Sequence, residues 1–286
     1  MAIDYEKLKA WPFPDEPRAW TWKDSALYAL GVGLGHDPLD DEELRFVYEK
    51  GMKALPTMAV VLPPPGFWLR DPETGVDWKR VVHGEESLAL HIPLPVEGRF
   101  VTQSRVEEIV DKGEGRGALI YLVREVFEAE TKQPVATIRR TTFARGDGGF
   151  GGPSGPAREP HALPDRAPDV FCELPTLAQQ ALLYRLNGDG NPLHADPDVA
   201  REAGFDRPIL HGLCTFGVAG HAVLKTLCGY DPTRLKRFDV RFSAPVYPGE
   251  TIRTEMWLDG PVVSFRARVV EREALVLNNG LAELAA

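Results

Sequence analysis

The chain has few cysteines, no long apolar run and no excess of basic residues. Its three cysteines, Cys172, Cys214 and Cys228, lack CxxC spacing, which argues against a disulfide framework and a structural zinc site. No run of about 18 apolar residues occurs, and the first residues lack the basic and apolar parts of a secretory signal, so we expect no membrane partner. The net charge of −9 argues against nucleic acid as a partner, because affinity for its phosphates depends on clustered Lys and Arg.

The 286 residues, 43% of them hydrophobic, are enough for one large domain or two domains of ordinary size. A glycine- and proline-rich segment at 146–156 divides the chain and predicts a flexible linker. The order of features repeats on either side of it: Tyr28 and Tyr184 are 156 residues apart, and Leu55 and Leu210 are 155 apart. These offsets favour a duplication, with an N-terminal domain at 1–150 and a C-terminal domain at 151–286.

The apolar pattern predicts an α+β layout in each half, with a long helix followed by antiparallel strands. In the second half, apolar or small residues recur at steps of three and four from Leu213 to Leu227, which indicates a buried helix. Gly217 and Gly220 weaken this helix by about 1 kcal/mol each relative to alanine, so we expect another element to approach it closely there. Alternation predicts strands at 88–95, 100–110, 119–130, 135–143, 238–244, 252–258 and 263–269.

The segment YRLNGDGNPLH, from Tyr184 to His194, is rich in turn formers and predicts an irregular loop. Asp189 and His194 stand five residues apart on this loop, where they can converge on one water and exchange protons with it. Spacing alone favours a plainer interpretation, in which Asp189 caps the next turn and His194 is an ordinary loop histidine.

His211 and Gly212 follow at the expected start of the long helix. Free backbone N–H groups and the positive end of the helix dipole suit a developing oxyanion there. Glycine would let a substrate carbonyl come close to the backbone, although simple helix packing explains Gly212 equally well. An acid, a base and oxyanion donors together indicate chemistry beside a carbonyl.

The D-x-N-P-L-H core at 189–194, followed by P-I-L-H-G at 208–212, resembles the hydratase-2 motif of the MaoC-like (R)-specific enoyl-CoA hydratases. Members of this type join two hot-dog units, of which the N-terminal one has lost catalysis, so the resemblance covers nearly the whole chain and implies a double hot-dog fold. At the 156-residue offset, Gly33 stands opposite Asp189 and Pro38 opposite His194. The first half therefore has neither the acid nor the base.

The resemblance implies reversible hydration of a trans-2-enoyl-CoA to a (3R)-3-hydroxyacyl-CoA, a reaction of fatty-acid β-oxidation. It implies no metal and no cofactor beyond the CoA of the substrate. Asp189 and His194 would activate the water, Asn191 would hold the water or the pair in place, and the Gly212 amide would stabilise the enolate oxygen. The further substrate contacts that it implies are Tyr184, Gly190, Pro192, Leu193, His211 and Phe242 in the second half and His83, Gly84 and Lys112 in the first.

Other interpretations stay open at this point. Lys112 equally fits a solvated turn lysine, Tyr184 an aromatic anchor under the loop, and Phe242 a core residue of its strand. The same chemistry on acyl-carrier-protein thioesters would make the chain a (3R)-hydroxyacyl-ACP dehydratase, and loss of chemistry would leave a non-catalytic acyl-CoA-binding protein. The resemblance also implies a homodimer, and the C-terminal Glu-Leu-Ala-Ala, unlike a peroxisomal Ser-Lys-Leu signal, favours a cytoplasmic location.

Overall fold

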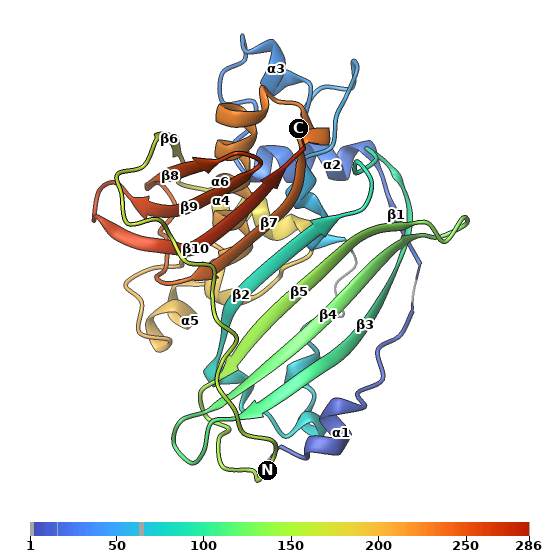
Figure 1. The fold of residues 1–286 in the computed structure, drawn as a ribbon, viewed down its shortest axis with the longest axis vertical. Coiled ribbons are helices and arrows are strands. Elements are labelled where there is room, and N and C mark those ends of the chain that lie inside the picture. Colours follow the sequence, from blue (N-terminus) through green and yellow to red (C-terminus); the bar gives the residue numbers. More distant parts are fainter. Residues whose placement is uncertain (1–2, 16, 63–65, 286) are drawn as a thin grey trace.

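The computed structural model describes residues 3–15, 17–62 and 66–285, and its strands form one curved antiparallel sheet with helices on one side (Figure 1). The order across the sheet is β1-β3-β4-β5-β2-β7-β10-β9-β8-β6. The strands are β1 (Arg18–Trp20), β2 (Val81–Leu90), β3 (Gly98–Asp111), β4 (Ala118–Glu128), β5 (Pro134–Ala144), β6 (Val170–Pro175), β7 (Leu235–Phe242), β8 (Thr251–Asp259), β9 (Val262–Val269) and β10 (Ala274–Leu284).

Six α-helices lie in the described residues: α1 (Tyr5–Lys9), α2 (Trp22–Gly31), α3 (Asp41–Leu44), α4 (Gln180–Tyr184), α5 (Pro197–Glu202) and α6 (Gly212–Cys228). Short 3-10 helices, among them η1 (Pro56–Val61), η5 (Arg185–Asn187) and η6 (Pro192–His194), connect them. Among the described residues, none of these helices has both the length and the apolar character needed to cross a bilayer.

The duplication is visible where the two halves join. Strand β2 of the first half pairs with β7 of the second in antiparallel register, and Glu86 stands opposite Val240. These two residues are 154 positions apart, close to the offset of the sequence repeat, so an approximate two-fold axis passes through this pair. The arrangement confirms the α+β double hot-dog class, with one continuous sheet shared by the two repeats.

Helix α6 is the long helix expected in the second half, and it begins and ends within one residue of the prediction. A Cβ at Gly217 would lie 2.5 Å from Val32, and one at Gly220 would meet Thr57, so both glycines make room for the first half. The close approach expected at these positions is confirmed.

A long helix in the first repeat was expected as well, and this detail is wrong. Its counterpart is η1, only six residues long, which opens with Pro56 and is followed by Leu62 in an extended conformation with ψ of 148°. Leu62 precedes proline in the sequence, and the ring of a following proline disfavours the helical region for the residue before it. Prolines at 63–65, which lie outside the described residues, lack the N–H that a continuing helix needs.

One strand begins earlier than predicted, and the strands β1, β6 and β10 were not predicted. Strand β2 starts at Val81 and not near residue 88, because the polar run HGEES lies between β5 and β7 and pairs with both. Strand β10 was missed because its apolar and polar residues do not alternate regularly. Its pairing with β7 and its pairing with β9 both contain register shifts.

The glycine-rich segment at 146–156 is irregular, as expected, but it is tied to the turn between β3 and β4. The Asp111 carboxylate accepts hydrogen bonds from the backbone N–H groups of Gly149 at 2.7 Å and Gly151 at 2.9 Å. Burial raises the pKa of Asp111, but these bonds and a third from Gly113 outweigh burial and lower the pKa overall.

Candidate active site

The loop that carries Asp189 is shaped by backbone capping. Gly188, with φ of 104°, ends η5 in a left-handed conformation that favours glycine, and η6 begins four residues later with Pro192. The Asn191 side chain accepts a hydrogen bond from the N–H of Leu193 at 3.2 Å, while the Asn191 N–H donates to Asp189 Oδ1 at 3.2 Å. Asn191 therefore fixes the turn between the acid and the histidine.

His194 ends η6 and is buried, with only 8% of its surface exposed. Its Nδ1 lies 2.9 Å from the carbonyl oxygen of Ile209, and because a carbonyl only accepts, Nδ1 carries the proton. Burial lowers the pKa of His194, outweighing the opposing effects of the Ile209 carbonyl and the Asp189 carboxylate. The neutral ring is left with a lone pair on Nε2, which is the arrangement of a general base.

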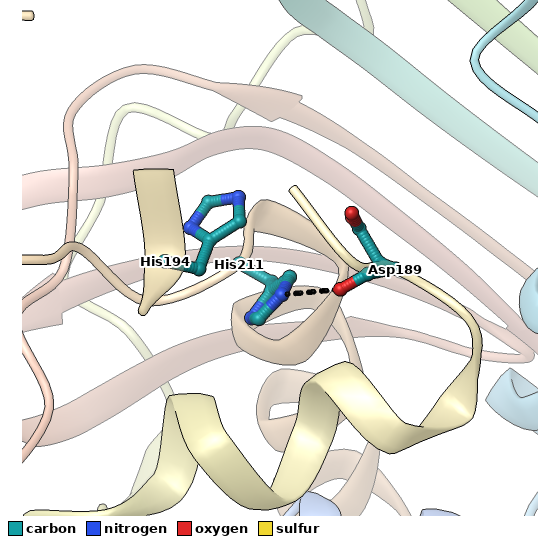
Figure 2. Close-up of side chains that lie close together, drawn as sticks. All are labelled: Asp189, His194 and His211. Carbon is teal, nitrogen blue, oxygen red and sulfur yellow. Dashed lines mark hydrogen bonds between the residues drawn. The ribbon is translucent and has the colours of Figure 1, made fainter. Parts of the chain in front are cut away.

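His211 packs directly beside His194, with ring centroids 3.8 Å apart, and occupies the residue just before α6 (Figure 2). Its Nε2 lies 3.3 Å from the backbone carbonyl of Asp189, so it ties the loop to the helix. Burial, together with the neighbouring His194, lowers the pKa of His211 to about 4. Its buried Nδ1 has no hydrogen-bond partner within the part of the chain that the structure describes.

Gly212 is the first residue of α6, where backbone N–H groups have no intrahelical partner. A Cβ at this position would lie 3.2 Å from the ring of Phe242, so glycine leaves the backbone open between that ring and the loop. Asp189, His194 and His211 converge at the same helix start (Figure 2). The predicted acid, base and helix N-terminus are thus brought together.

Strand β2 brings residues of the first half close to the start of α6. The ring of His83 lies 4.5 Å from that of Phe242, whose strand β7 pairs with β2. His83 Nε2 is 2.8 Å from Glu86 Oε2. Gly84 forms the register shift between His83 and Glu85, and a Cβ there would lie 3.2 Å from the Thr141 carbonyl.

The other predicted contacts divide into two groups. Tyr184 is 1% exposed, and its ring lies 5.1 Å from that of His211, so it packs under the loop as an anchor. Gly190 and Pro192 are exposed and Leu193 is half-buried on the same loop. Lys112 is not brought to the loop: it sits in the β3–β4 turn, and its ammonium donates to the Gly155 carbonyl at 3.1 Å.

A buried charge cluster beside this site was missed by the sequence reasoning. Glu86 accepts hydrogen bonds from Arg140 of β5 at 3.0 and 3.2 Å, and Arg124 of β4 lies 3.5 Å from it. Burial raises the pKa of Glu86, but Arg140 and His83 outweigh it and hold the pKa at about 2. The available signal was a charge at an inward strand position, since Glu86 shares a face with the buried Leu88.

Metal ligation is the other chemistry that these side chains allow. One ligand atom from each of Asp189, His194 and His211 lies within 4.8 Å of the others. Ligand atoms that share one zinc ion are about 3.3 Å apart, given bonds of about 2.0 Å in tetrahedral geometry.

Two family models divide the chain between them: the MFE-2 hydratase 2 N-terminal domain matches residues 19–146, and the MaoC like domain matches residues 160–279. The probable enoyl-CoA hydratase 2 of Dictyostelium discoideum is 42% identical over 293 residues, covering 99% of this chain and 97% of that protein. The chain belongs to the MaoC-like enoyl-CoA hydratase 2 family. The loop at 189–194 and helix α6 fall in its MaoC-like part.

Two further members resemble this hydratase-2 chain over their full lengths. The 3-hydroxyacyl-thioester dehydratase Y of Mycobacterium tuberculosis is 39% identical, covering 100% of both chains. The crystal structure of a MaoC-like dehydratase from Phytophthora capsici is 33% identical and superposes with a TM-score of 0.85, covering 99% of both chains. Both repeats, and not the MaoC-like part alone, are therefore shared with these proteins.

Proposed function

We propose that this chain is a hydro-lyase that reversibly adds water to trans-2-enoyl-CoA and gives (3R)-3-hydroxyacyl-CoA. The observation that carries the proposal is the convergence of Asp189 and His194 at the N-terminus of α6, beside Gly212. The relatives named enoyl-CoA hydratase 2 and 3-hydroxyacyl-thioester dehydratase support the two directions of the same reaction.

The proposed steps follow from the tautomer of His194. Its neutral Nε2 accepts a proton from water, and the water oxygen forms a bond to C3 of the enoyl thioester. The electron pair of the C2–C3 double bond moves toward the thioester carbonyl, whose oxygen is stabilised by the Gly212 N–H. C2 then takes a proton from the Asp189–His194 pair, which restores both side chains.

Asn191 and Tyr184 act in this scheme by holding the loop. Asn191 links the acid to the turn through its backbone N–H and its side-chain oxygen. The Tyr184 ring packs against the ring of His211 and so holds it in place. The rings of His83 and Phe242 lie against each other, and Phe242 also lies beside Gly212. We propose that His83 and Phe242 contact the thioester end of the substrate.

The chemistry requires no cofactor in this scheme, because CoA arrives as part of the substrate. We further propose residues 1–150 as the half that shapes the substrate pocket and 151–286 as the catalytic half. A homodimer in the cytoplasm completes the proposal. Light scattering would test the dimer, and imaging of the tagged chain in its own cell would test the location.

The experiment is loss of the enoyl-thioester absorbance with trans-2-enoyl-CoA of short, medium and long chain, against the same acyl groups on acyl carrier protein. We expect kcat/KM to favour the CoA thioesters. Preference for the carrier-protein thioesters would replace the proposal with the ACP dehydratase. Tight binding of acyl-CoA without turnover of either substrate would favour the acyl-CoA-binding protein.

A further inference from the structure

A buried carboxylate of the first half holds one of the proposed substrate contacts. Glu86 lies on β2, three residues after His83, and is 0% exposed. His83 Nε2 lies 2.8 Å from Glu86 Oε2, while 25% of the His83 side chain is exposed. One member of this pair is therefore closed to solvent, and the other is open to a ligand.

Two arginines on the neighbouring strands keep Glu86 charged. Arg140 of β5 donates to the two carboxylate oxygens at 3.0 and 3.2 Å, and Arg124 of β4 lies 3.5 Å from one of them. A buried charge needs such partners, because an unpaired one is strongly destabilising. Although burial raises the pKa of Glu86, Arg140 and His83 hold it at about 2, so the group is ionised at neutral pH.

The cluster is anchored to the backbone of the first repeat. The Arg124 guanidinium donates to the carbonyl oxygens of Val60 at 2.9 Å and Leu62 at 3.3 Å, at the end of η1. A long helix would use such carbonyls for its own hydrogen bonds, whereas the short η1 leaves them for Arg124. The frame that holds Glu86 is therefore part of the fold and is in place before substrate binds.

The ionised carboxylate decides which tautomer His83 takes. A carboxylate only accepts hydrogen bonds, so the proton in the bond between the two residues lies on His83 Nε2. Burial and the nearby Arg140 lower the pKa of His83, which keeps the ring neutral at physiological pH and leaves a lone pair on Nδ1. Glu86 thus fixes both the orientation of the ring and the place of its one proton.

The ring held in this way lies where the two halves meet, close to the start of α6. Its centroid is 4.5 Å from that of the Phe242 ring on β7. The Phe242 ring in turn would lie 3.2 Å from a Cβ at Gly212, the first residue of α6. A chain of close contacts therefore runs from Glu86 through His83 and Phe242 to the helix start.

We infer that Glu86 is a positioning residue for substrate binding: it holds His83 as the Nε2–H tautomer, whose Nδ1 accepts a hydrogen bond from an amide N–H of the CoA arm. The inference rests on the proposed function and on the proposed contact of His83 with substrate. It assigns the buried charges of the first half to binding of the thioester end, and not to the proton transfers at Asp189 and His194.

Nitrogen-15 NMR of the histidine rings tests the tautomer without any assay of activity. At neutral pH we expect His83 to give the signals of a neutral ring protonated on Nε2, identified by their loss in His83→Ala. Glu86→Gln replaces an accepting oxygen by a donating amide, so the two ring nitrogens of His83 should move toward averaged shifts. Protonation on Nδ1 in the wild type, or unchanged His83 signals in Glu86→Gln, would overturn the inference.

Steady-state kinetics with trans-2-enoyl-CoA tests the consequence for substrate. We expect Glu86→Gln and His83→Ala each to raise KM about fivefold while kcat stays within about twofold of wild type. Because Glu86 acts through His83, the double variant should have the KM of His83→Ala, and increases that multiply would overturn the inference. The matched control is Glu85→Gln: this neighbouring carboxylate accepts from the Thr141 hydroxyl at 2.7 Å, and its loss should leave KM unchanged.

Glu86→Asp covers the case in which Glu86→Gln does not fold, since Glu86→Gln leaves two guanidinium groups without a countercharge. Aspartate keeps the charge for the arginines but is one methylene shorter, so we expect a folded protein with altered His83 signals and a raised KM. Wild-type KM and wild-type His83 signals in Glu86→Asp would overturn the inference. An inactive wild-type enzyme would instead contradict the proposed function, and the NMR result would still decide whether Glu86 fixes the tautomer of His83.

Discussion

The two halves of the sheet contain matching strands but differ in what lies against them. The second half packs the 17-residue helix α6 on its strands, and the N-terminus of that helix meets Asp189 and His194. The first half has only η1 at the corresponding place and puts buried charges, Glu86 and Arg124, beside it. The comparison teaches that one repeat keeps the long helix whose start meets the proposed catalytic residues, and the other has a short 3-10 helix and buried charges in its place.

We expect the largest loss of activity when the acid Asp189 is removed from the second half. We expect Asp189→Asn to lower kcat by about a thousandfold or more, because the pair can no longer return a proton to C2. The control is Asp196→Asn, which changes another loop carboxylate, the N-cap of α5, and should keep near wild-type kcat. Both rates come from the absorbance assay, and an Asp189→Asn enzyme within tenfold of wild type would remove Asp189 from the mechanism.

Two glycines of α6 distinguish its N-terminal end, which we propose to be catalytic, from its packed middle. Gly212→Ala pushes against Phe242 at 3.2 Å, so we expect kcat to fall about tenfold with little change in stability. Gly217→Ala would place a methyl group 2.5 Å from Val32, and this overpacking should cost about 1 to 3 kcal/mol of stability. Thermal melts and kcat are measured for both variants. If Gly212→Ala and Gly217→Ala changed kcat equally and changed the melting temperature equally, the two ends of α6 would not differ in role as proposed.

The contact between the halves should also depend on pH through His221, which is buried in α6. Burial lowers its pKa to about 4, from 6.5 when unfolded, although the nearby Glu43 opposes the shift. Between these values the unfolded chain binds a proton that the folded chain does not. The free energy of unfolding should therefore fall as pH drops below 6.5, by about 2 kcal/mol at pH 5 for this one group.

Denaturant unfolding of wild type and His221→Gln near pH 7.5 and pH 5 measures this contribution. The variant should show the smaller loss between the two conditions. An identical loss in both proteins would mean that His221 does not contribute to the pH dependence.

The smallest expected effect is that of Lys112→Ala. Because the Lys112 ammonium is bonded to Gly155 in the β3–β4 turn, we expect an unchanged kcat and a KM for enoyl-CoA that rises at most about threefold. Steady-state kinetics at two salt concentrations would check this. A larger rise in KM that disappears at high salt would show that Lys112 is released to bind the CoA phosphates.

The local parts of this picture could be predicted from sequence. Apolar periodicity located α6, and the turn formers between Tyr184 and His194 located the loop, because both signals depend on neighbours in the chain. The Glu86–Arg140 pair could not be found in this way. It joins residues 54 positions apart through the register of β2 and β5, and pairing of distant strands leaves no mark in either segment alone.

The short helix of the first repeat was missed although a local signal for it was present in the sequence. Three prolines in sequence could have ended the expected helix at Leu62, but the similarity between the repeats outweighed that signal. His83 could be named from the motif, whereas its contact with Phe242 required the pairing of β2 with β7.

The most direct test of the central claim is the configuration of the product that the wild-type enzyme forms from trans-2-enoyl-CoA. Oxidation of that product by a (3R)-specific dehydrogenase, and none by a (3S)-specific one, is the result predicted for water added at the Asp189–His194 site. A (3S) product, or an Asp189→Asn enzyme that forms the product as fast as wild type, would contradict the account.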